Sequence, residues 1–120
     1  MMSIILFKDY TFEAAHKLPN VAKEHKCYKL HGHSFLIRIS IKGEINNDTG
    51  FILDFKQIDD VFKPIQVKLN HSYLNVIKGL ENPTIEILSR WIWKKLKPKL
   101  NELYSIKINE TFTSGCIYKE

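Results

Sequence analysis

Residues 31–41, HGHSFLIRISI, hold the clearest two-residue repeat in the chain. The apolar members of the repeat are Phe35, Ile37, Ile39 and Ile41. Alternate side chains of an extended segment point to opposite faces, so one face of this segment is apolar and the other is largely polar. The pattern predicts a half-buried β-strand over residues 31–45.

Three further segments are typical of strands that would join the same sheet. They are residues 4–15, residues 51–53 and residues 104–112. Turn-forming residues (Asn-Asn-Asp-Thr-Gly) fill positions 46–50, so the sequence predicts a hairpin whose returning strand is residues 51–53.

Two segments show the three- and four-residue spacing of amphipathic helices. Asp54 is a favourable helix cap before an apolar stripe that runs to Leu69, and Pro64 should kink or shorten that helix. A second stripe begins after Asn82-Pro83-Thr84 and runs to Leu96. Together with the strands, these helices predict an α+β domain: an antiparallel sheet that carries two helices on one face.

The length of 120 residues predicts a single domain over residues 1–120. A domain this small leaves much of its surface exposed to solvent, so oligomerisation is a natural way to bury more apolar area. The apolar stretches are too short for a membrane span, and the apolar run at residues 4–7 is too short for the core of an export signal. We therefore expect a cytoplasmic protein without a membrane partner.

The net charge of +5 comes from 18 basic and 13 acidic residues. The densest basic run is Arg90, Lys94, Lys95, Lys97 and Lys99. Because no exposed aromatic residues obviously interleave with this run, it is typical of a solvated helix face and not of an RNA-binding surface. We expect no nucleic-acid partner, although a basic surface favours an anionic substrate such as a polyphosphate.

His31-Gly32-His33 is the sharpest local feature of the chain. Histidines two apart on a strand point to the same face, and here that face also carries Phe35, so both imidazoles should point inward. Their Cβ atoms would lie about 6 to 7 Å apart, which suits two imidazoles that converge on one cation. The alternative is a pair of core or surface histidines without a metal.

His16 is the best candidate for the third ligand that a stable zinc site needs. It ends the segment Phe12-Glu13-Ala14-Ala15-His16 and would lie beside His31 if the first two strands pair. Three neutral imidazoles with an open fourth position are typical of a catalytic zinc, which acidifies hydroxyl groups and polarises carbonyl groups.

Cys27 stands four residues before His31, and the spacing alone leaves its role open. It could be a fourth zinc ligand, a thiolate base activated by nearby lysines and the metal, or a loop cysteine without a role. The other cysteine, Cys116, could pair with it in principle. Two cysteines in a chain without an export signal are more often free thiols, which is what we expect here.

His71 and Glu110 are two further candidates. His71 follows a helix and sits in a loop, where functional side chains concentrate, although a loop histidine is often an ordinary surface residue. Glu110 shares the parity of Ile106 and Ile108, so it should point inward, where a carboxylate is costly unless it is paired. The alternative for Glu110 is an exposed position at the end of its strand.

Six motifs together resemble those of the 6-pyruvoyl- and 6-carboxy-tetrahydropterin synthase family. The motifs are Phe12-Glu13-Ala14-Ala15-His16, Cys27-x-x-x-His31-Gly32-His33, Asp54-Phe55, Leu69-Asn70-His71-x-x-Leu74-Asn75, Asn82-Pro83-Thr84-x-Glu86 and Glu110-Thr111. No single motif is decisive, but six of them in this order, in a chain of the family's length, are highly specific.

The resemblance implies a fold and an assembly. The fold would be the tunnelling fold, in which sheets of neighbouring subunits join into a barrel. The assembly would be a homohexamer built from two trimers, with active sites at the subunit interfaces.

The resemblance also implies roles for the residues singled out above. The zinc ligands would be His16, His31 and His33. Cys27 would be the base that abstracts a proton, and His71 would belong to a proton relay. Glu110, followed by Thr111 in the motif, would grip the guanidine-like edge of the pterin, since a carboxylate can accept two parallel N–H bonds from such an edge.

The spacing between Cys27 and His31 resembles that of the carboxy-forming branch, because the pyruvoyl-forming branch usually has a longer gap. The carboxy-forming reaction converts 7,8-dihydroneopterin triphosphate into 6-carboxy-5,6,7,8-tetrahydropterin, acetaldehyde and triphosphate, on the route to the queuosine base of tRNA. We expect this reaction, with Lys17, Lys23 or Lys29 as candidates to contact the triphosphate. The pyruvoyl-forming reaction is the alternative.

One position departs from the family pattern. The family usually has Asp directly before the relay histidine, whereas this chain has Asn70. An Asn can orient an imidazole by a hydrogen bond, but it cannot stabilise an imidazolium as a carboxylate does. His71 should then be a weaker base unless Glu110 supplies the missing charge, and a non-catalytic zinc- or pterin-binding relative is a further alternative.

Overall fold

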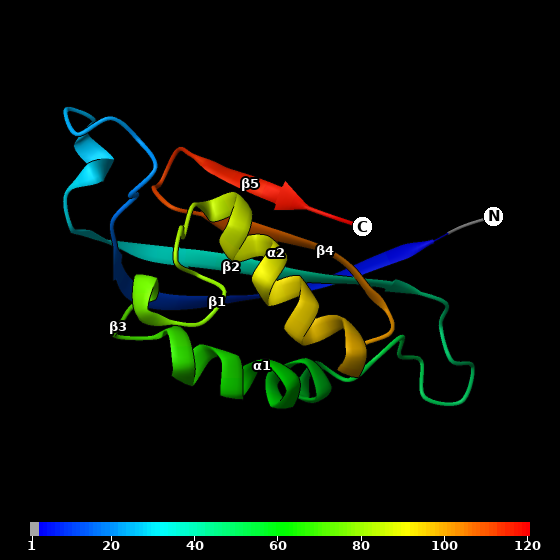
Figure 1. Ribbon diagram of the computed structural model, residues 1–120. Coiled ribbons are helices and arrows are strands. Elements are labelled where there is room, and N and C mark those ends of the chain that lie inside the picture. Colours follow the sequence, from blue (N-terminus) through cyan, green and yellow to red (C-terminus); the bar gives the residue numbers. More distant parts are fainter. Residues whose placement is uncertain (1–2) are drawn as a thin grey trace.

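The computed structural model describes residues 3–120 and shows one five-stranded sheet with two helices packed on one face (Figure 1). The strands are β1 (Ile4–His16), β2 (His31–Gly43), β3 (Ser72–Tyr73), β4 (Leu103–Asn109) and β5 (Gly115–Tyr118). The helices are α1 (Phe55–Leu69) and α2 (Ile85–Leu96). Short 3-10 turns are η1 (Lys26–Tyr28), η2 (Leu74–Val76) and η3 (Lys97–Lys99). The predicted α+β class is confirmed.

The strand order is β3-β1-β2-β4-β5. All neighbouring strands are antiparallel except β3, which pairs in parallel with β1 through two residues. The longest pairing joins β1 and β2 without a break, from Ile4 opposite Gly43 to His16 opposite His31. This register matters most for function because it aligns the ends of the two strands that carry histidines.

Two predictions about the strands are wrong. Residues 51–53 form no strand, because the preceding loop closes on itself: the Asn46 N–H donates to the Phe51 carbonyl oxygen at 2.7 Å. The last predicted strand ends at Asn109, and the chain then turns back as β5. Gly115 permits this return because an added Cβ would overlap the carbonyl oxygen of Ile108.

Both helices begin at side-chain caps. The Asp54 carboxylate accepts the Lys56 N–H at 2.9 Å, and the Asp54 N–H donates to Gln57 at 3.2 Å, which completes a capping box. Thr84 caps α2 by accepting the Ile87 N–H at 3.1 Å. Of the two effects predicted for Pro64, a kink or an early end of α1, the early end is not observed: the helix continues through Pro64, which is exposed on the solvent side.

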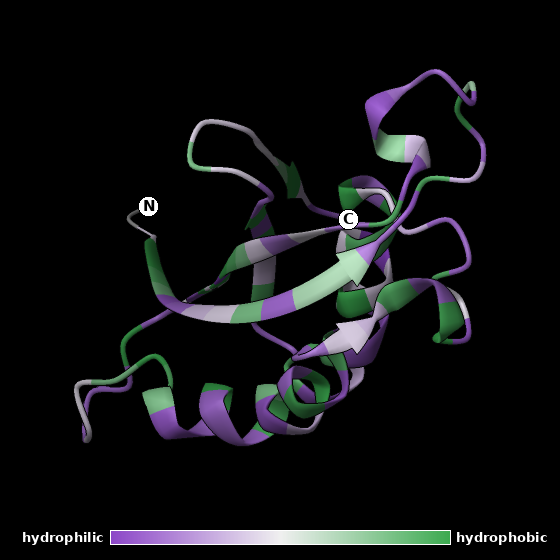
Figure 2. Cartoon of the chain, turned by 90° about the vertical axis from the view of Figure 1, so that its left-hand side faces the viewer, coloured by the Kyte–Doolittle hydropathy of each residue, from purple (hydrophilic) through white to green (hydrophobic). Residues whose placement is uncertain are grey.

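The core lies between the sheet and the helices. Residues of β1 and β2 alternate between a buried face toward the helices and an exposed face, as the two-residue repeat predicts, and Figure 2 shows this alternation in hydropathy along the strands. Phe12 and Phe35 stack across β1 and β2 with ring centroids 5.0 Å apart. Both rings are at most 1% exposed and pack directly behind the histidine-bearing end of the sheet.

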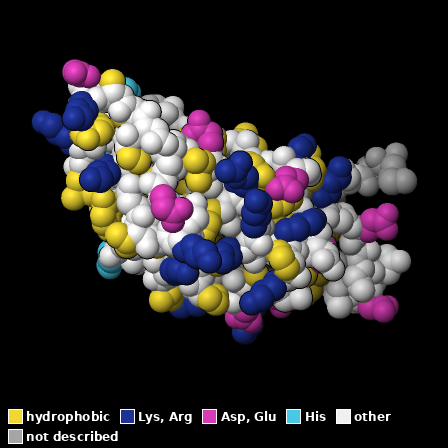
Figure 3. Space-filling view, viewed as in Figure 1, with side chains coloured by type: hydrophobic (Ala, Val, Ile, Leu, Met, Phe, Trp, Pro, Cys, Tyr) yellow, Lys and Arg dark blue, Asp and Glu magenta, His cyan; other side chains and the backbone are white. Residues whose placement is uncertain are grey.

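Lysine and arginine side chains gather over α1 and α2 (Figure 3). The half-buried Trp91 lies among them, with the ammonium groups of Lys68 and Lys95 at 5.8 and 5.2 Å from its ring centroid. Because Trp91 is half-buried, it is not an exposed aromatic of the kind whose absence was expected, and the absence of a nucleic-acid partner stays a prediction. Within residues 3–120, neither helix is long and apolar enough to cross a bilayer.

Candidate metal centre

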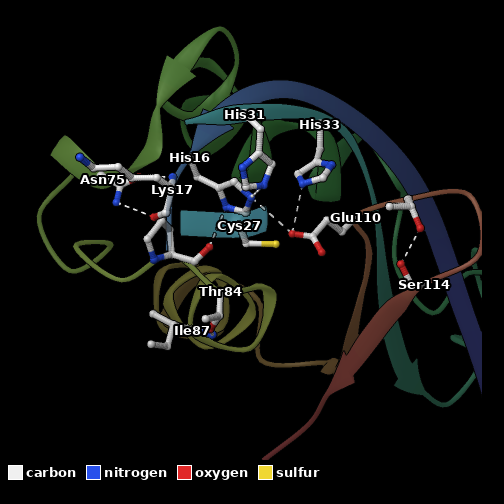
Figure 4. Close-up of polar contacts among 12 residues, drawn as sticks. His16, Lys17, Cys27, His31, His33, Asn75, Thr84, Ile87, Glu110 and Ser114 are labelled. Atoms are coloured by element: carbon white, nitrogen blue, oxygen red, sulfur yellow. Dashed lines mark hydrogen bonds and ion pairs between the residues drawn. The ribbon is translucent and has the colours of Figure 1, made fainter. Parts of the chain in front are cut away.

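Three histidines converge at one end of the sheet (Figure 4). The β1–β2 register sets His16 directly opposite His31, and strand parity places His33 on the same face. Their ligand atoms all lie within 4.8 Å of one another. The structure therefore brings together the three histidines that the sequence singles out, including the predicted pairing of His16 with His31.

Backbone carbonyls fix the orientation of two of these rings. The Nδ1 atom of His16 lies 2.9 Å from the Pro83 carbonyl oxygen, and Nδ1 of His31 lies 2.8 Å from the Lys29 carbonyl oxygen. A carbonyl can only accept, so each Nδ1 carries the hydrogen and each Nε2 presents a lone pair. This arrangement is typical of metal-binding histidines, whose second ring nitrogen is held by an acceptor.

The two oriented Nε2 atoms, of His16 and His31, lie 3.0 Å apart. With both hydrogens on Nδ1, two lone pairs face each other at this distance and repel unless a cation lies between them. The Nε2 atom of His33 is buried and has no hydrogen-bond partner within residues 3–120. A buried polar atom without a partner is costly, and a metal ion would satisfy it. The donor set thus fits a metal ion such as zinc.

Burial also favours the neutral, metal-binding form of the His16 and His33 imidazoles. Desolvation is the main cause that lowers the pKa of His16 and of His33, and His31 lowers both pKa values further. The Pro83 carbonyl and Glu110 act in the opposite direction on His16, but the net pKa is lowered. Two of the three candidate ligands are therefore favoured in the form that binds a cation.

Glu110 approaches the histidines from the end of β4. Its Oε1 atom lies 3.4 Å from Nε2 of His16 and 3.4 Å from Nε2 of His33. The predicted inward parity is confirmed, since Ile106 and Ile108 are fully buried and the Glu110 side chain is only 25% exposed. In Figure 4 the carboxylate lies beside the histidine rings and points at their nitrogen atoms.

Cys27 belongs to η1, in the loop that joins β1 to β2. The backbone of this residue is held on both sides: its N–H donates to Nδ1 of His25 at 3.0 Å, and its carbonyl accepts the Leu18 N–H at 2.8 Å. In Figure 4 the thiol points toward the gap between the histidines and Glu110. The three-histidine cluster does not include Cys27, so the geometry favours a role beside the metal over a role as its ligand.

His71 lies apart from the cluster, at the edge of the sheet. It has a backbone φ of 59°, at the position after the α1 C-cap where glycine is usual, and its N–H donates to the Glu13 carbonyl oxygen. Such a conformation costs about 1–2 kcal/mol in a non-glycine residue. A histidine therefore occupies a position where glycine would adopt the same backbone conformation at a lower energy. Its exposed side chain lines a cavity of about 450 Å³ that also reaches Gly32 and His33.

Asn70, the residue before His71, already forms a hydrogen bond through its side chain. The side-chain carbonyl of Asn70 accepts the Glu13 N–H at 2.9 Å. This bond ties the end of α1 to β1 and uses the oxygen that was expected to orient the imidazole of His71. No hydrogen bond joins Asn70 to that ring within residues 3–120.

Thr111 and Cys116 lie outside the cluster. The exposed Thr111 hydroxyl pairs with the Ser114 hydroxyl in the turn that leads to β5. The Cys116 thiol lies 3.1 Å from the Ser89 hydroxyl, and burial is the main cause that raises its pKa. Both cysteines are free thiols, as expected.

Three supporting groups were not found by sequence reasoning: the carbonyls of Lys29 and Pro83, and the side chain of Asn75. Asn75 accepts the Lys17 N–H at 3.0 Å and donates to the Lys17 carbonyl at 2.8 Å, which pins the chain just after His16. Pro83 and Asn75 lie in motifs quoted above. Every residue has a backbone carbonyl, so the sequence does not indicate which carbonyl orients a ring.

Comparisons with known proteins show which family the chain resembles. The family model described as 6-pyruvoyl tetrahydropterin synthase matches residues 5–120. The 6-carboxy-5,6,7,8-tetrahydropterin synthase of Synechocystis sp. is 38% identical over 95% of this chain and 92% of its own. The 6-pyruvoyl tetrahydrobiopterin synthase of Dictyostelium discoideum is 30% identical over 98% of this chain and 96% of its own.

A solved structure supports the fold separately. The 6-pyruvoyl tetrahydropterin synthase of Caenorhabditis elegans superposes with a TM-score of 0.91, at 21% identity, over 100% of this chain and 97% of that one. At this identity the likeness concerns the fold alone.

Proposed function

The chain belongs to the 6-pyruvoyl tetrahydropterin synthase family, and on this premise we propose that it is a zinc-dependent 6-carboxy-5,6,7,8-tetrahydropterin synthase. The substrate would be 7,8-dihydroneopterin triphosphate, and the products 6-carboxy-5,6,7,8-tetrahydropterin, acetaldehyde and triphosphate. The reaction would serve queuosine biosynthesis. The identity of 38% to the 6-carboxy-5,6,7,8-tetrahydropterin synthase of Synechocystis sp. and the short gap between Cys27 and His31 support this branch.

The observation that carries the proposal is the facing pair of Nε2 atoms, 3.0 Å apart, on His16 and His31. Together with Nε2 of His33, which has no hydrogen-bond partner within residues 3–120, they form a three-nitrogen donor set that suits zinc. A zinc ion held there would acidify hydroxyl groups and polarise carbonyl groups of the substrate side chain.

The remaining residues supply proton chemistry in this proposal. Cys27, with its backbone held and its thiol beside the cluster, would remove a proton from a carbon of the substrate side chain. His71 would carry protons to and from the pterin. Thr111, next to Glu110 at the turn before β5, is a candidate for contact with the substrate.

We propose that Glu110 acts at the metal end of the substrate. The guanidine-like edge of a pterin lies across the ring from the reacting side chain, so a residue that grips this edge cannot also lie against the metal ligands. Its carboxylate is 3.4 Å from two of the three Nε2 atoms. This position supports a role beside the reacting side chain in place of the expected grip on the pterin edge.

The position of His71 supports the expected homohexamer with active sites at subunit interfaces. His71 is exposed at the β3 edge of the sheet and is not part of the cluster in its own chain. The uncovered face of the sheet also carries large apolar side chains, with Phe7 46% and Leu36 40% exposed. A neighbouring subunit would cover such surface, and His71 would serve the site formed there. The cytoplasmic location stays a prediction.

Product analysis tests the proposed reaction. Zinc-loaded protein mixed with 7,8-dihydroneopterin triphosphate should release acetaldehyde and 6-carboxy-5,6,7,8-tetrahydropterin, both followed by mass spectrometry. A pyruvoyl product without acetaldehyde would assign the sister reaction. Binding of zinc and pterin without turnover would assign a non-catalytic relative.

Replacing Asn70 with Asp tests the departure from the family pattern. Aspartate can accept the Glu13 N–H with one oxygen and leave the second free to stabilise a protonated His71. We expect kcat to rise about two- to tenfold if this proton transfer limits turnover. Steady-state kinetics would measure it, with Asn101→Asp, at an exposed turn, as the charge-matched control. An unchanged kcat would show that the relay does not depend on residue 70.

A further inference from the structure

We propose that His25 is a positioning residue, whose imidazole fixes the turn that presents the Cys27 thiol to the site. The inference rests on the proposed function, in which Cys27 is the base. It goes beyond that function by giving a role to a histidine that lies outside the metal-binding cluster.

His25 builds this turn with its backbone and with its side chain. Its N–H donates to the Ala22 carbonyl oxygen at 2.9 Å, and its own carbonyl oxygen accepts the Tyr28 N–H at 3.0 Å, which closes η1. Nδ1 of its imidazole accepts the Cys27 N–H at 3.0 Å. Any residue would supply the two backbone bonds, but the bond to Cys27 needs a side-chain acceptor at position 25. The imidazole thus caps η1 as Ser, Thr, Asp or Asn usually caps a helix.

The bond to Cys27 also fixes the tautomer of His25. Because Nδ1 accepts a hydrogen, it carries none itself, and the ring holds its hydrogen on Nε2. His16 and His31 have the opposite tautomer, with the hydrogen on Nδ1 and a free lone pair on Nε2. The lone pair of His25 is therefore committed to the turn and not to a cation.

The position of Cys27 depends on bonds made inside its own loop. Residues 17–30 project from the end of the sheet (Figure 1), and within residues 3–120 no hydrogen bond joins residues 19–28 to an element outside this loop. The Cys27 backbone is held by two bonds, one to His25 and one from the Leu18 N–H at 2.8 Å. Without the first bond, this residue could rotate about the second. A general base acts only within about 3 Å of the proton it removes, so such a rotation would misplace the thiol.

Three substitutions at position 25 separate the side-chain bond from the rest of the residue. Oδ1 of asparagine is bonded to Cγ, as Nδ1 of histidine is, so His25→Asn can accept the Cys27 N–H at the same reach. The corresponding oxygen of His25→Gln lies one bond farther out, and His25→Ala has no acceptor. Asparagine and glutamine therefore form a matched pair with the same chemistry and a different reach.

Steady-state kinetics with 7,8-dihydroneopterin triphosphate tests the inference. We expect kcat to fall about ten- to a hundredfold in His25→Ala and His25→Gln, since a displacement of about 1 Å costs up to a hundredfold in rate. In His25→Asn, kcat should stay within about threefold of the wild type, because asparagine is a good cap. KM and zinc content should change little in all three variants, since His25 belongs to neither the cluster nor the cavity beside it.

Nuclear magnetic resonance of the zinc-loaded protein gives a second readout that does not need turnover. The nitrogen chemical shifts of the imidazoles should place the hydrogen on Nε2 in His25 and on Nδ1 in His16 and His31. Hydrogen exchange of the Cys27 amide should be faster in His25→Ala and His25→Gln than in the wild type and His25→Asn.

Four outcomes would overturn the inference. An unchanged kcat in His25→Ala would show that the turn presents the thiol without the imidazole. An equal loss of kcat in the Asn, Gln and Ala variants would show that the bond to Cys27 is not what His25 supplies. A hydrogen on Nδ1 of His25 in the wild type would exclude the bond itself. A zinc-loaded wild type without turnover would overturn the proposed function and, with it, the role of this turn in catalysis.

Discussion

Replacing His16 with Ala is expected to abolish stoichiometric zinc binding and to lower turnover by about a thousandfold or more, because several kcal/mol of transition-state stabilisation would be lost with the metal. His16 is fully buried and central to the cluster, with Nε2 3.0 Å from that of His31. Its loss leaves two histidine ligands, and two are too few for a stable zinc site.

Zinc content and thermal unfolding would measure this effect. Saturating zinc should raise the Tm of the wild type, since a ligand that binds only the folded chain stabilises it, and should leave the Tm of His16→Ala unchanged. His25→Ala, which removes an exposed histidine outside the cluster, is the control and should keep its zinc. A His16→Ala protein with one tightly bound zinc per chain would contradict the three-histidine assignment.

The convergence of the histidines could be predicted because it follows from strand parity. Two residues apart on one strand, His31 and His33 must share a face, and the repeat through Phe35 fixes which face is buried. Only the placement of His16 needed a further assumption, namely that the first two strands pair. A long uninterrupted register makes this pairing robust, since a slip of one residue would turn every apolar side chain outward.

The strand errors arise where a local turn competes with a weak strand signal. Residues 51–53 are apolar, but the bond from the Asn46 N–H to the Phe51 carbonyl closes the loop before a ladder can form. The return to β5 depends on the bare backbone of Gly115 beside the Ile108 carbonyl. Such close approaches are set by tertiary packing, and short segments of this kind are ambiguous in sequence.

The prediction of the site from the sequence was incomplete for a different reason. Its orienting groups are the carbonyls of Lys29 and Pro83, and every residue has a carbonyl, so neither stands out. The engagement of Asn70 with the Glu13 N–H also depends on how α1 meets β1. For Glu110, parity gave the direction of the side chain, but only the distances to His16 and His33 show what it faces.

Replacing Cys27 with Ala is expected to reduce turnover by about 10²- to 10⁴-fold, the usual contribution of a positioned general base, while zinc remains bound. The variant should fold normally, since the bonds that hold this residue, to His25 and Leu18, come from its backbone and not from its thiol. Steady-state kinetics, with the metal content of the same samples, would separate the two effects.

The second cysteine provides the matched control for this prediction. Cys116→Ala also removes one half-buried thiol, but that thiol is tied to Ser89 and carries a raised pKa through burial, so it should be a poor nucleophile and turnover should persist. Alkylation should likewise inactivate the wild type and Cys116→Ala by modifying Cys27. Full turnover in zinc-loaded Cys27→Ala would exclude the thiol as the base and would leave His71 as the other proton-transfer group proposed for this site.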